Sequence, residues 1–150
     1  MIKEAINNNC LVDLLVLDGS LNKYYFNVTY VSKEIIKKLS SLDTTSNFIG
    51  IVKMKEMNNN FGNRILILDD IQDPGNAGTI IRNAVAFGID TIVFSKSSVS
   101  AYNEKTLRST GGMIFNTNII IGDLSHVISQ IKNDNIKVIG TSLNTSKSLE

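Results

Sequence analysis

The residues with the clearest chemical meaning are those at 73–78, Asp-Pro-Gly-Asn-Ala-Gly, which include the only proline of the chain. They stand between a run of branched aliphatic residues and a segment with helical periodicity. Proline pre-sets a turn, and Gly75 and Gly78 remove side chains, so another group can approach the backbone closely. The amide groups that a helix exposes at its start favour an anion. This loop is therefore a candidate binding site for a negatively charged group.

Arg82 is the only charged residue of the helical segment 77–88 and follows the glycine loop by about one turn. Its neighbours on that helix face are the small residues Gly78 and Ala86. A guanidinium in such a place can meet a phosphate or another anion. It can equally pair with a carboxylate of the chain itself, and three are near in the sequence: Asp69, Asp70 and Asp73. The residue types alone leave these two interpretations open.

The elements on either side of the loop are predicted by their hydrophobic patterns. Residues 65–68 (Ile-Leu-Ile-Leu) have no polar alternation, which is typical of a strand buried on both faces of a parallel sheet. After the loop, the helix is expected to begin at Ala77, with Asn76 as its N-cap. It is expected to end at Gly88 in a left-handed conformation. The order is strand, loop, helix.

The same order repeats further along the chain. Lys105 and Arg108 are three residues apart on the next helical segment, so both can present charge to one side. A serine-rich loop, residues 95–101, precedes that segment. The remaining elements are predicted as strands at 91–94, 118–121 and 137–140 and an amphipathic helix at 123–131. Alternating strands and helices predict an α/β fold for residues 65–150, in which a parallel sheet carries helices on both faces.

Residues 1–53 are expected to form a smaller α/β unit, joined to the larger one by a polar linker at 54–64. The small unit is predicted to contain helices at 2–8 and 32–40 and strands at 11–17, 28–31 and 48–52. Its second helix carries Lys33, Lys37 and Lys38 on the polar side. Such lysines can contact RNA phosphate, although a triplet of this kind is more often only a solvated face.

The glycine loop and its helix also carry a resemblance. Residues 68–78, followed by Arg82 and by Ala-Phe-Gly at 86–88, are similar to the first motif of the SpoU (TrmH-like) family, within the SPOUT superfamily of knotted RNA methyltransferases. Residues 105–115 resemble the second motif, with Thr110 where many members have serine. Several residue types fall at the family's spacing, so the match is far more specific than a single glycine pattern.

This resemblance implies an enzyme that transfers a methyl group from S-adenosylmethionine to a ribose 2′-hydroxyl of RNA, with ribosomal RNA as the expected substrate and no metal. It implies that Arg82 contacts the target phosphate and assists deprotonation, and that Asn76 orients the loop and the substrate. Lys105, Arg108 and Thr110 would bind RNA. The small unit would be the later part of an RNA-binding domain.

The family's third motif has no clear match in the printed sequence. Residues 142–146 are superficially similar to it, but the glycine- and glutamate-bearing loop that should come first does not precede them. We therefore predict a SPOUT-type fragment that lacks the knot segment, is inactive by itself and forms a homodimer in its full-length state. The cofactor-binding candidates are Thr141, Ser142 and Leu143, at the end of the last predicted strand.

The composition of the chain also bears on nucleic-acid binding, membrane association and metal binding. Lys plus Arg (15) and Asp plus Glu (14) nearly cancel, so any nucleic-acid site must be local. Apolar runs are only strand-sized and the amino end has no signal-peptide pattern, which predicts a cytoplasmic protein without a membrane segment. The single His126 and the single Cys10 form no metal-ligand pattern, and Cys10 is expected to be a packed thiol.

The alternatives to an enzyme are a non-catalytic RNA-binding module and a phosphate-binding α/β protein.

Overall fold

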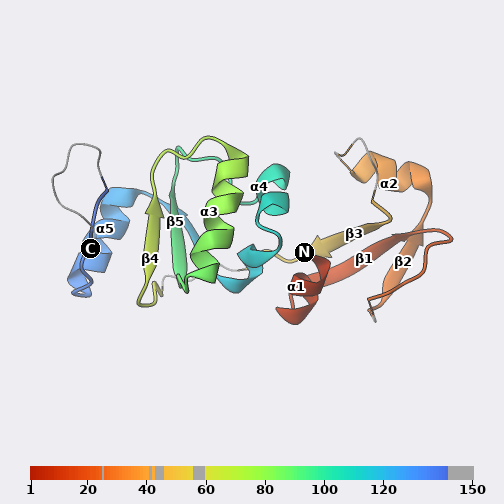
Figure 1. The fold of residues 1–150 in the computed structure, drawn as a ribbon, viewed down its shortest axis with the longest axis horizontal. Coiled ribbons are helices and arrows are strands. Elements are labelled where there is room, and N and C mark those ends of the chain that lie inside the picture. Colours follow the sequence, from red (N-terminus) through yellow and green to blue (C-terminus); the bar gives the residue numbers. More distant parts are fainter. Residues whose placement is uncertain (25, 41, 43–45, 56–59, 142–150) are drawn as a thin grey trace.

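The computed structural model describes residues 1–24, 26–40, 42, 46–55 and 60–141. Its strands form two three-stranded sheets that follow one another along the long axis of the molecule (Figure 1). Between the sheets, the described residues 53–55 and 60–64 form neither helix nor strand. The division into domains at 54–64 stays a prediction.

The second sheet is parallel throughout. Its strands are β4 (Ile65–Leu68), β5 (Thr91–Ser95) and β6 (Asn118–Gly122), in the order β4-β5-β6. The helical segments are α3 (Pro74–Ala86), α4 (Glu104–Ser109), the 3-10 turn η1 (Met113–Asn116) and α5 (Leu124–Asn133). Every residue of the central strand β5 is buried, because this strand is covered on both faces.

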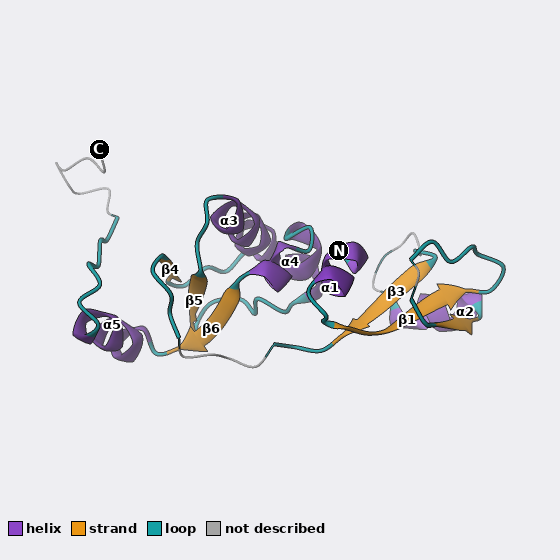
Figure 2. Ribbon diagram, turned by 90° about the horizontal axis from the view of Figure 1, so that it is seen from below, coloured by secondary structure: helices purple, strands orange, loops and turns teal. Residues whose placement is uncertain are grey.

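Helices cover both faces of this sheet. Ile92 and Phe94 of β5 belong to the same hydrophobic cluster as Ile81 of α3. Val93, which lies between them, belongs to a second cluster with Val127 of α5. Alternate residues of a strand point to opposite faces, so α3 and α5 lie on opposite sides, and Figure 2 shows α3 and α4 together on one side. The predicted α/β architecture is confirmed.

The first sheet has the order β2-β1-β3, with β1 parallel to β2 and antiparallel to β3. This unit contains α1 (Ile2–Asn7), β1 (Leu11–Leu17), β2 (Val28–Val31), α2 (Lys33–Leu39) and β3 (Phe48–Val52). The bounds agree with the predicted ones to within about one residue at each helix end. Ile36 anchors α2 with a fully buried side chain, while the three lysines of this helix are exposed.

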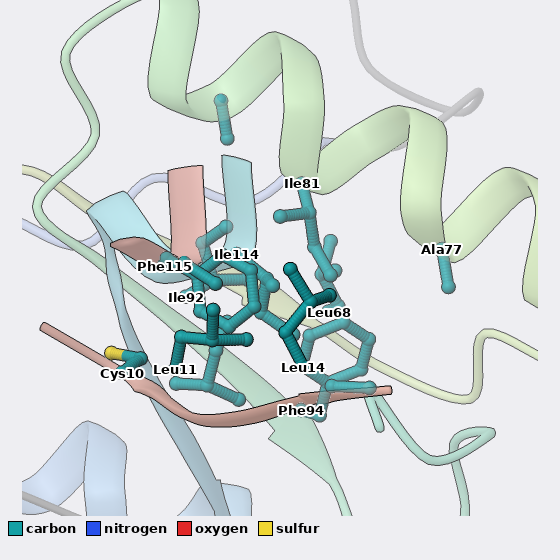
Figure 3. Close-up of a cluster of buried hydrophobic side chains, with 14 of the residues drawn as sticks. Cys10, Leu11, Leu14, Leu68, Ala77, Ile81, Ile92, Phe94, Ile114 and Phe115 are labelled. Atoms are coloured by element: carbon teal, nitrogen blue, oxygen red, sulfur yellow. The ribbon is translucent and has the colours of Figure 1, made fainter. Parts of the chain in front are cut away.

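One hydrophobic cluster joins the two sheets. Cys10 and Leu14, from the first unit, belong to the same cluster as Phe115 of η1 (Figure 3). Cys10 is buried, which confirms the predicted packed thiol. At the same junction the side-chain amide of Asn8 donates a hydrogen bond to the side-chain oxygen of Asn116 at 3.1 Å. The first unit therefore rests against the turn that follows α4.

Helix α3 begins earlier than its apolar pattern predicts. The predicted N-cap, Asn76, is wrong. Asp73 is the N-cap, and its Oδ1 accepts a hydrogen bond from the backbone amide of Asn76 at 2.7 Å. Pro74 is the first helical residue, where a missing N–H has no intrahelical partner to lose. The predicted end is confirmed, because Gly88 has a φ of 72°.

The strand predicted at residues 137–140 is also wrong, since the structure forms no strand there. Val138 and Ile139 are 38% and 61% exposed. A cleft of about 540 Å³, lined by β4 on one side and by residues 136–141 on the other, lies between this segment and the sheet. No neighbouring strand therefore supplies the hydrogen bonds that a strand needs. Within the described sheet, β4 is an edge strand.

Candidate functional site

The start of α3 is held by its own N-cap residue. Asp73 accepts the hydrogen bond from Asn76 and also forms an ion pair with Lys105 of α4, with 3.7 Å between Oδ2 and Nζ. The hydrogen bond from Asn76, and to a lesser degree the charge of Lys105, hold the pKa of the Asp73 carboxyl below its usual value. The anion at this helix start is thus a side chain of the chain itself. An aspartate directly before a proline at the first helical position is the signal that could have identified it.

Helices α3 and α4 touch at Gly78. A Cβ atom placed on this residue would lie 2.4 Å from Cβ of Ser109 and 2.5 Å from the carbonyl oxygen of Thr106. Atoms that are not bonded do not approach so closely. The absence of a side chain at Gly78 therefore lets α4 pack closely against the α3 backbone. This packing places the two motifs on neighbouring helices.

We call the surface made by the exposed polar residues of the two helices the motif surface. It is defined by Asn76 and Arg82 of α3 and by Lys105 and Arg108 of α4. All of these side chains are solvent-exposed. The structure thereby places the predicted catalytic residues on α3 and two of the predicted RNA-binding residues on α4, the helix that packs against it at Gly78.

The charges of the motif surface differ in their partners. Lys105 is paired with Asp73, and Arg108 lies 3.7 Å from Glu104 on its own helix. The side chain of Arg82 forms no ion pair or hydrogen bond with any other described residue, so it makes none of the three aspartate pairs that the sequence left open. Arg82 is exposed, and within the described part of the chain none of its guanidinium donors is used.

Thr110, the third predicted RNA-binding residue, is placed differently. It is fully buried, and its hydroxyl donates to the carbonyl oxygen of Leu107 at 2.7 Å. The hydroxyl oxygen of Thr110 in turn accepts from the backbone amide of Gly112 at 3.1 Å. Thr110 ends α4 as its C-cap. Its hydroxyl is used inside the chain to turn the backbone after the helix, and an RNA contact for it stays a prediction.

The cofactor-binding candidates lie at the end of the described chain. Thr141 lines the cleft beside β4, together with Asp69 at the carboxyl end of that strand. Ser142 and Leu143 lie outside the described residues. The cleft is mainly apolar, because isoleucines of β4 and α5 form much of its wall.

No feature of the described ranges suggests a metal or a membrane span. Within them, no group of three or more His, Cys, Asp or Glu residues could hold a metal ion. His126 is exposed on α5, and its backbone amide donates to Asp123, the N-cap of that helix, at 3.1 Å. None of the described helices is long and apolar enough to cross a bilayer.

Comparison with known proteins bears on the fold and the motifs together. The model of the SpoU rRNA Methylase family matches residues 63–150, which include the whole motif surface. The chain belongs to the SpoU family. The resemblance of residues 68–78 and 105–115 to the motifs of that family is thereby confirmed.

Individual members and neighbours of the SpoU family cover most of the chain. The 23S rRNA (guanosine(2553)-2'-O)-methyltransferase RlmP of Bacillus subtilis (strain 168) is 32% identical over 113 residues, which are 75% of this chain and 46% of RlmP. A crystal structure of an RNA 2'-O ribose methyltransferase has a TM-score of 0.74 at 24% identity, over 97% of this chain and 61% of that one. The SpoU methyltransferase AviRb from Streptomyces viridochromogenes, solved in complex with AdoMet, has a TM-score of 0.73 at 18% identity, over 89% of this chain and 56% of AviRb. These two structures share the fold, and the chain spans about half the length of RlmP.

Substitution of Asp73 tests the helix start. Asp73→Ala removes both the capping oxygen and the charge, whereas Asp73→Asn keeps an oxygen that can cap but loses the pairing with Lys105. We expect the alanine variant to melt at a lower temperature than the asparagine variant, and both below the wild type, in thermal unfolding followed by circular dichroism. Equal melting temperatures for the two variants would show that the capping oxygen does not stabilise α3.

The stabilisation that the Asp73 charge contributes should depend on pH. The pKa of Asp73 is lowered in the folded chain, so its charge contributes stability above the unfolded pKa of about 4. This contribution is lost as the pH falls through the folded pKa. The difference in unfolding free energy between wild type and Asp73→Asn should therefore shrink below about pH 4 and stay constant near neutrality.

Proposed function

We propose that the full-length protein transfers a methyl group from S-adenosylmethionine to a ribose 2′-hydroxyl of RNA, with ribosomal RNA as the substrate. Membership of the SpoU family and the activity for which RlmP is named support this proposal. The observation that carries it is Arg82, an exposed arginine without an internal partner among the described residues, on the surface where both motifs meet. Association as a homodimer, which the family resemblance implies, is part of the same proposal, as is the cytoplasmic location predicted from the sequence.

The proposed roles follow from the chemistry of the reaction. A ribose hydroxyl is a poor nucleophile at neutral pH, so a catalyst must hold it in line with the methyl donor and stabilise the developing alkoxide charge. Arg82 would bind the target phosphate with its planar fork and assist loss of the hydroxyl proton. Asn76 would orient the substrate, while Lys105 and Arg108 would add contacts to neighbouring phosphates. S-adenosylmethionine, when bound, supplies an electrophilic methyl group, and the reaction needs no metal.

The residues beside β4 fit this cofactor in size and chemistry. A cleft of about 540 Å³ lies within the range of small-molecule sites. Ile67 and Ile139 offer apolar walls for an adenine ring, and the hydroxyl of Thr141 and the carboxylate of Asp69 are polar partners for a nucleoside. We therefore propose Thr141 as a cofactor contact, and keep Ser142 and Leu143 as candidates from the sequence.

A non-catalytic RNA-binding module is the main alternative. Exposed cations on both units, such as Lys33 of α2 and Lys105 of α4, would serve such a module as well. A protein that only binds phosphate at the start of α3 is less well supported, because Asp73 already supplies the negative group there. Methyl transfer distinguishes the enzyme from both alternatives.

The proposal is tested with the full-length protein, tritium-labelled S-adenosylmethionine and ribosomal RNA. Transfer of label followed by digestion to nucleosides should yield a 2′-O-methylated nucleoside. Label recovered in a base would contradict the ribose specificity. Binding of RNA without binding of the cofactor, measured by calorimetry, would instead identify a binding module.

Residues 1–150 by themselves are expected to behave differently from the full-length protein. We predict weak or no binding of S-adenosylmethionine and no methyl transfer, because the family resemblance implies that the third-motif segment forms most of the cofactor pocket and the cleft beside β4 only part of it. We also predict concentration-dependent self-association. The physical reason for self-association is the edge strand β4, which has no strand partner on its outer side within the described sheet, next to the exposed apolar side chains Val138 and Ile139. Calorimetry, the tritium assay and sedimentation velocity check these expectations. Cofactor binding in the micromolar range, about −8 kcal/mol, would contradict the first of them.

A further inference from the structure

Two loops meet at the edge of the second sheet where the strands end. We call residues 69–73 the motif loop, because they lead from β4 into α3, and residues 95–98 the serine loop, which begins with the last residue of β5. β4 and β5 are adjacent and parallel, with Leu68 opposite Phe94. Their carboxyl ends therefore bring the two loops side by side, although about 25 residues separate them in the sequence.

Serine hydroxyls hold the backbone of the motif loop. The amide of Asp70 donates to Oγ of Ser95 at 2.9 Å, and the amide of Ile71 donates to Oγ of Ser98 at 3.0 Å. The carbonyl oxygen of Ile71 accepts from the amide of Val99 at 2.8 Å. Successive backbone groups of the motif loop are thus bonded to the neighbouring loop rather than to water.

The hydroxyl groups also bond to one another. Oγ of Ser95 lies 3.0 Å from Oγ of Ser97 and 2.8 Å from Oγ of Ser98. A hydroxyl has one proton and two lone pairs, so with the amide of Asp70 these partners use the full capacity of Ser95. Ser95 is 6% exposed, and loss of its oxygen would leave a partly buried amide without a partner.

This network stabilises a backbone conformation that the motif loop would not favour by itself. Asp70 has a φ of 54°, which is uncommon for a residue other than glycine. The side-chain amide of Gln72 donates both to Oδ1 of Asp70, at 2.7 Å, and to the carbonyl oxygen of Ser97, at 2.9 Å. A left-handed residue persists only where its surroundings over-determine it, and here the serine loop supplies that constraint.

We propose that Ser95 and Ser98 are positioning residues for the methyl-transfer site. By setting the backbone at Asp70 and Ile71, they set the point at which Asp73 begins α3, and through α3 the placement of the motif surface. This inference rests on the proposed function. It assigns a role to the serine-rich loop, which the family motifs do not include.

Substitutions at Ser98 separate the hydroxyl from the shape of the side chain. The side chains introduced by Ser98→Thr and Ser98→Val have nearly the same volume, and only threonine keeps the hydroxyl. Ser98 is half-buried. Ser100→Ala is the matched control, because its Oγ accepts only from the nearby amide of Tyr102, at 3.2 Å, outside the network. Each variant is made in the full-length protein.

We expect Ser98→Val to lower kcat on the order of 100-fold, since small displacements of catalytic groups have effects of this size. KM for RNA and for S-adenosylmethionine should change by about twofold or less. Hydrogen exchange at the amides of Asp70 and Ile71 should accelerate in the same variant. Ser98→Thr should restore both kcat and slow exchange, and Ser100→Ala should resemble the wild type.

The outcomes distinguish this inference from the proposed function. An active wild type with an equally active Ser98→Val variant would overturn the positioning role and leave the function intact. The same holds if valine and threonine variants lose activity equally, because the hydroxyl would then not be the cause. A full-length wild type that methylates no RNA would overturn the function itself, and this inference with it.

Discussion

Arg82→Lys in the full-length protein is expected to lose most of its methyl transfer, on the order of 100-fold or more in kcat, with little change in affinity for S-adenosylmethionine. Lysine keeps the positive charge but not the planar guanidinium that can hold a phosphate with two parallel hydrogen bonds. Arg82 is exposed and has no ion pair among the described residues, so the substitution breaks no internal pairing. The melting temperature should therefore stay unchanged while turnover falls.

The tritium assay, calorimetry with the cofactor and thermal unfolding measure these quantities separately. Lys132→Arg is the control for an exchange of one cation for the other elsewhere on the chain. Lys132 is exposed on α5, which packs on the face of the sheet opposite to α3. Near-normal turnover of the Arg82 variant would show that Arg82 is an exposed, solvated residue without a role in methyl transfer. Loss of turnover in both variants would mean that the effect is not specific to the position of Arg82.

Gly78→Ala is expected to destabilise the chain by about 2 kcal/mol or more. Two effects oppose each other at this position. In the middle of a helix, alanine is favoured over glycine by about 1 kcal/mol. Against this, the new methyl group would lie 2.4 Å from Cβ of Ser109 and 2.5 Å from the carbonyl oxygen of Thr106. Neither atom is the mobile end of a side chain, so α4 as a whole must move, and the overpacking cost should exceed the gain in propensity.

Urea unfolding of residues 1–150 measures the stability change. Thr79→Ala, at the exposed neighbouring position of the same helix, is the control for helix propensity. Gly140→Ala is the control for glycine replacement as such, because a Cβ there meets no atom within 4 Å. Higher stability of the Gly78 variant would show that α3 and α4 are not packed as closely as described. Displacement of α4 should also separate Lys105 from Asp73.

The sequence by itself determined most of the secondary structure, because each element follows a local pattern of apolar and turn-forming residues. The apolar run at 65–68 became β4, and the central strand β5 is buried over its whole length, as a strand covered on both faces must be. Gly88 adopts its positive φ because a residue without Cβ does so at no steric cost. The motif residue types and their spacing also indicated the family that the comparisons confirmed.

Other features depend on which segments become neighbours in space. Residues 137–140 have a strand-like apolar pattern, but hydrogen bonds to another strand make a strand, and a cleft lies between this segment and β4. Thr110 looks like a surface residue of a basic helix, yet it is buried where the backbone turns toward η1. No local rule predicts either result, since burial depends on what packs against a residue.

The candidate site shows the same distinction. Arg82 could be identified from the sequence as an isolated charge, but only the folded chain shows that Lys105, and not Arg82, pairs with Asp73. The roles of Gly78 and Ser95 likewise depend on contacts with α4 and with the motif loop, which are distant in the sequence. Hydrophobic periodicity and turn chemistry act over a few residues, so the sequence determines the elements. The approach of two helices or two loops depends on the packing of the whole sheet, and the tertiary structure alone decides it.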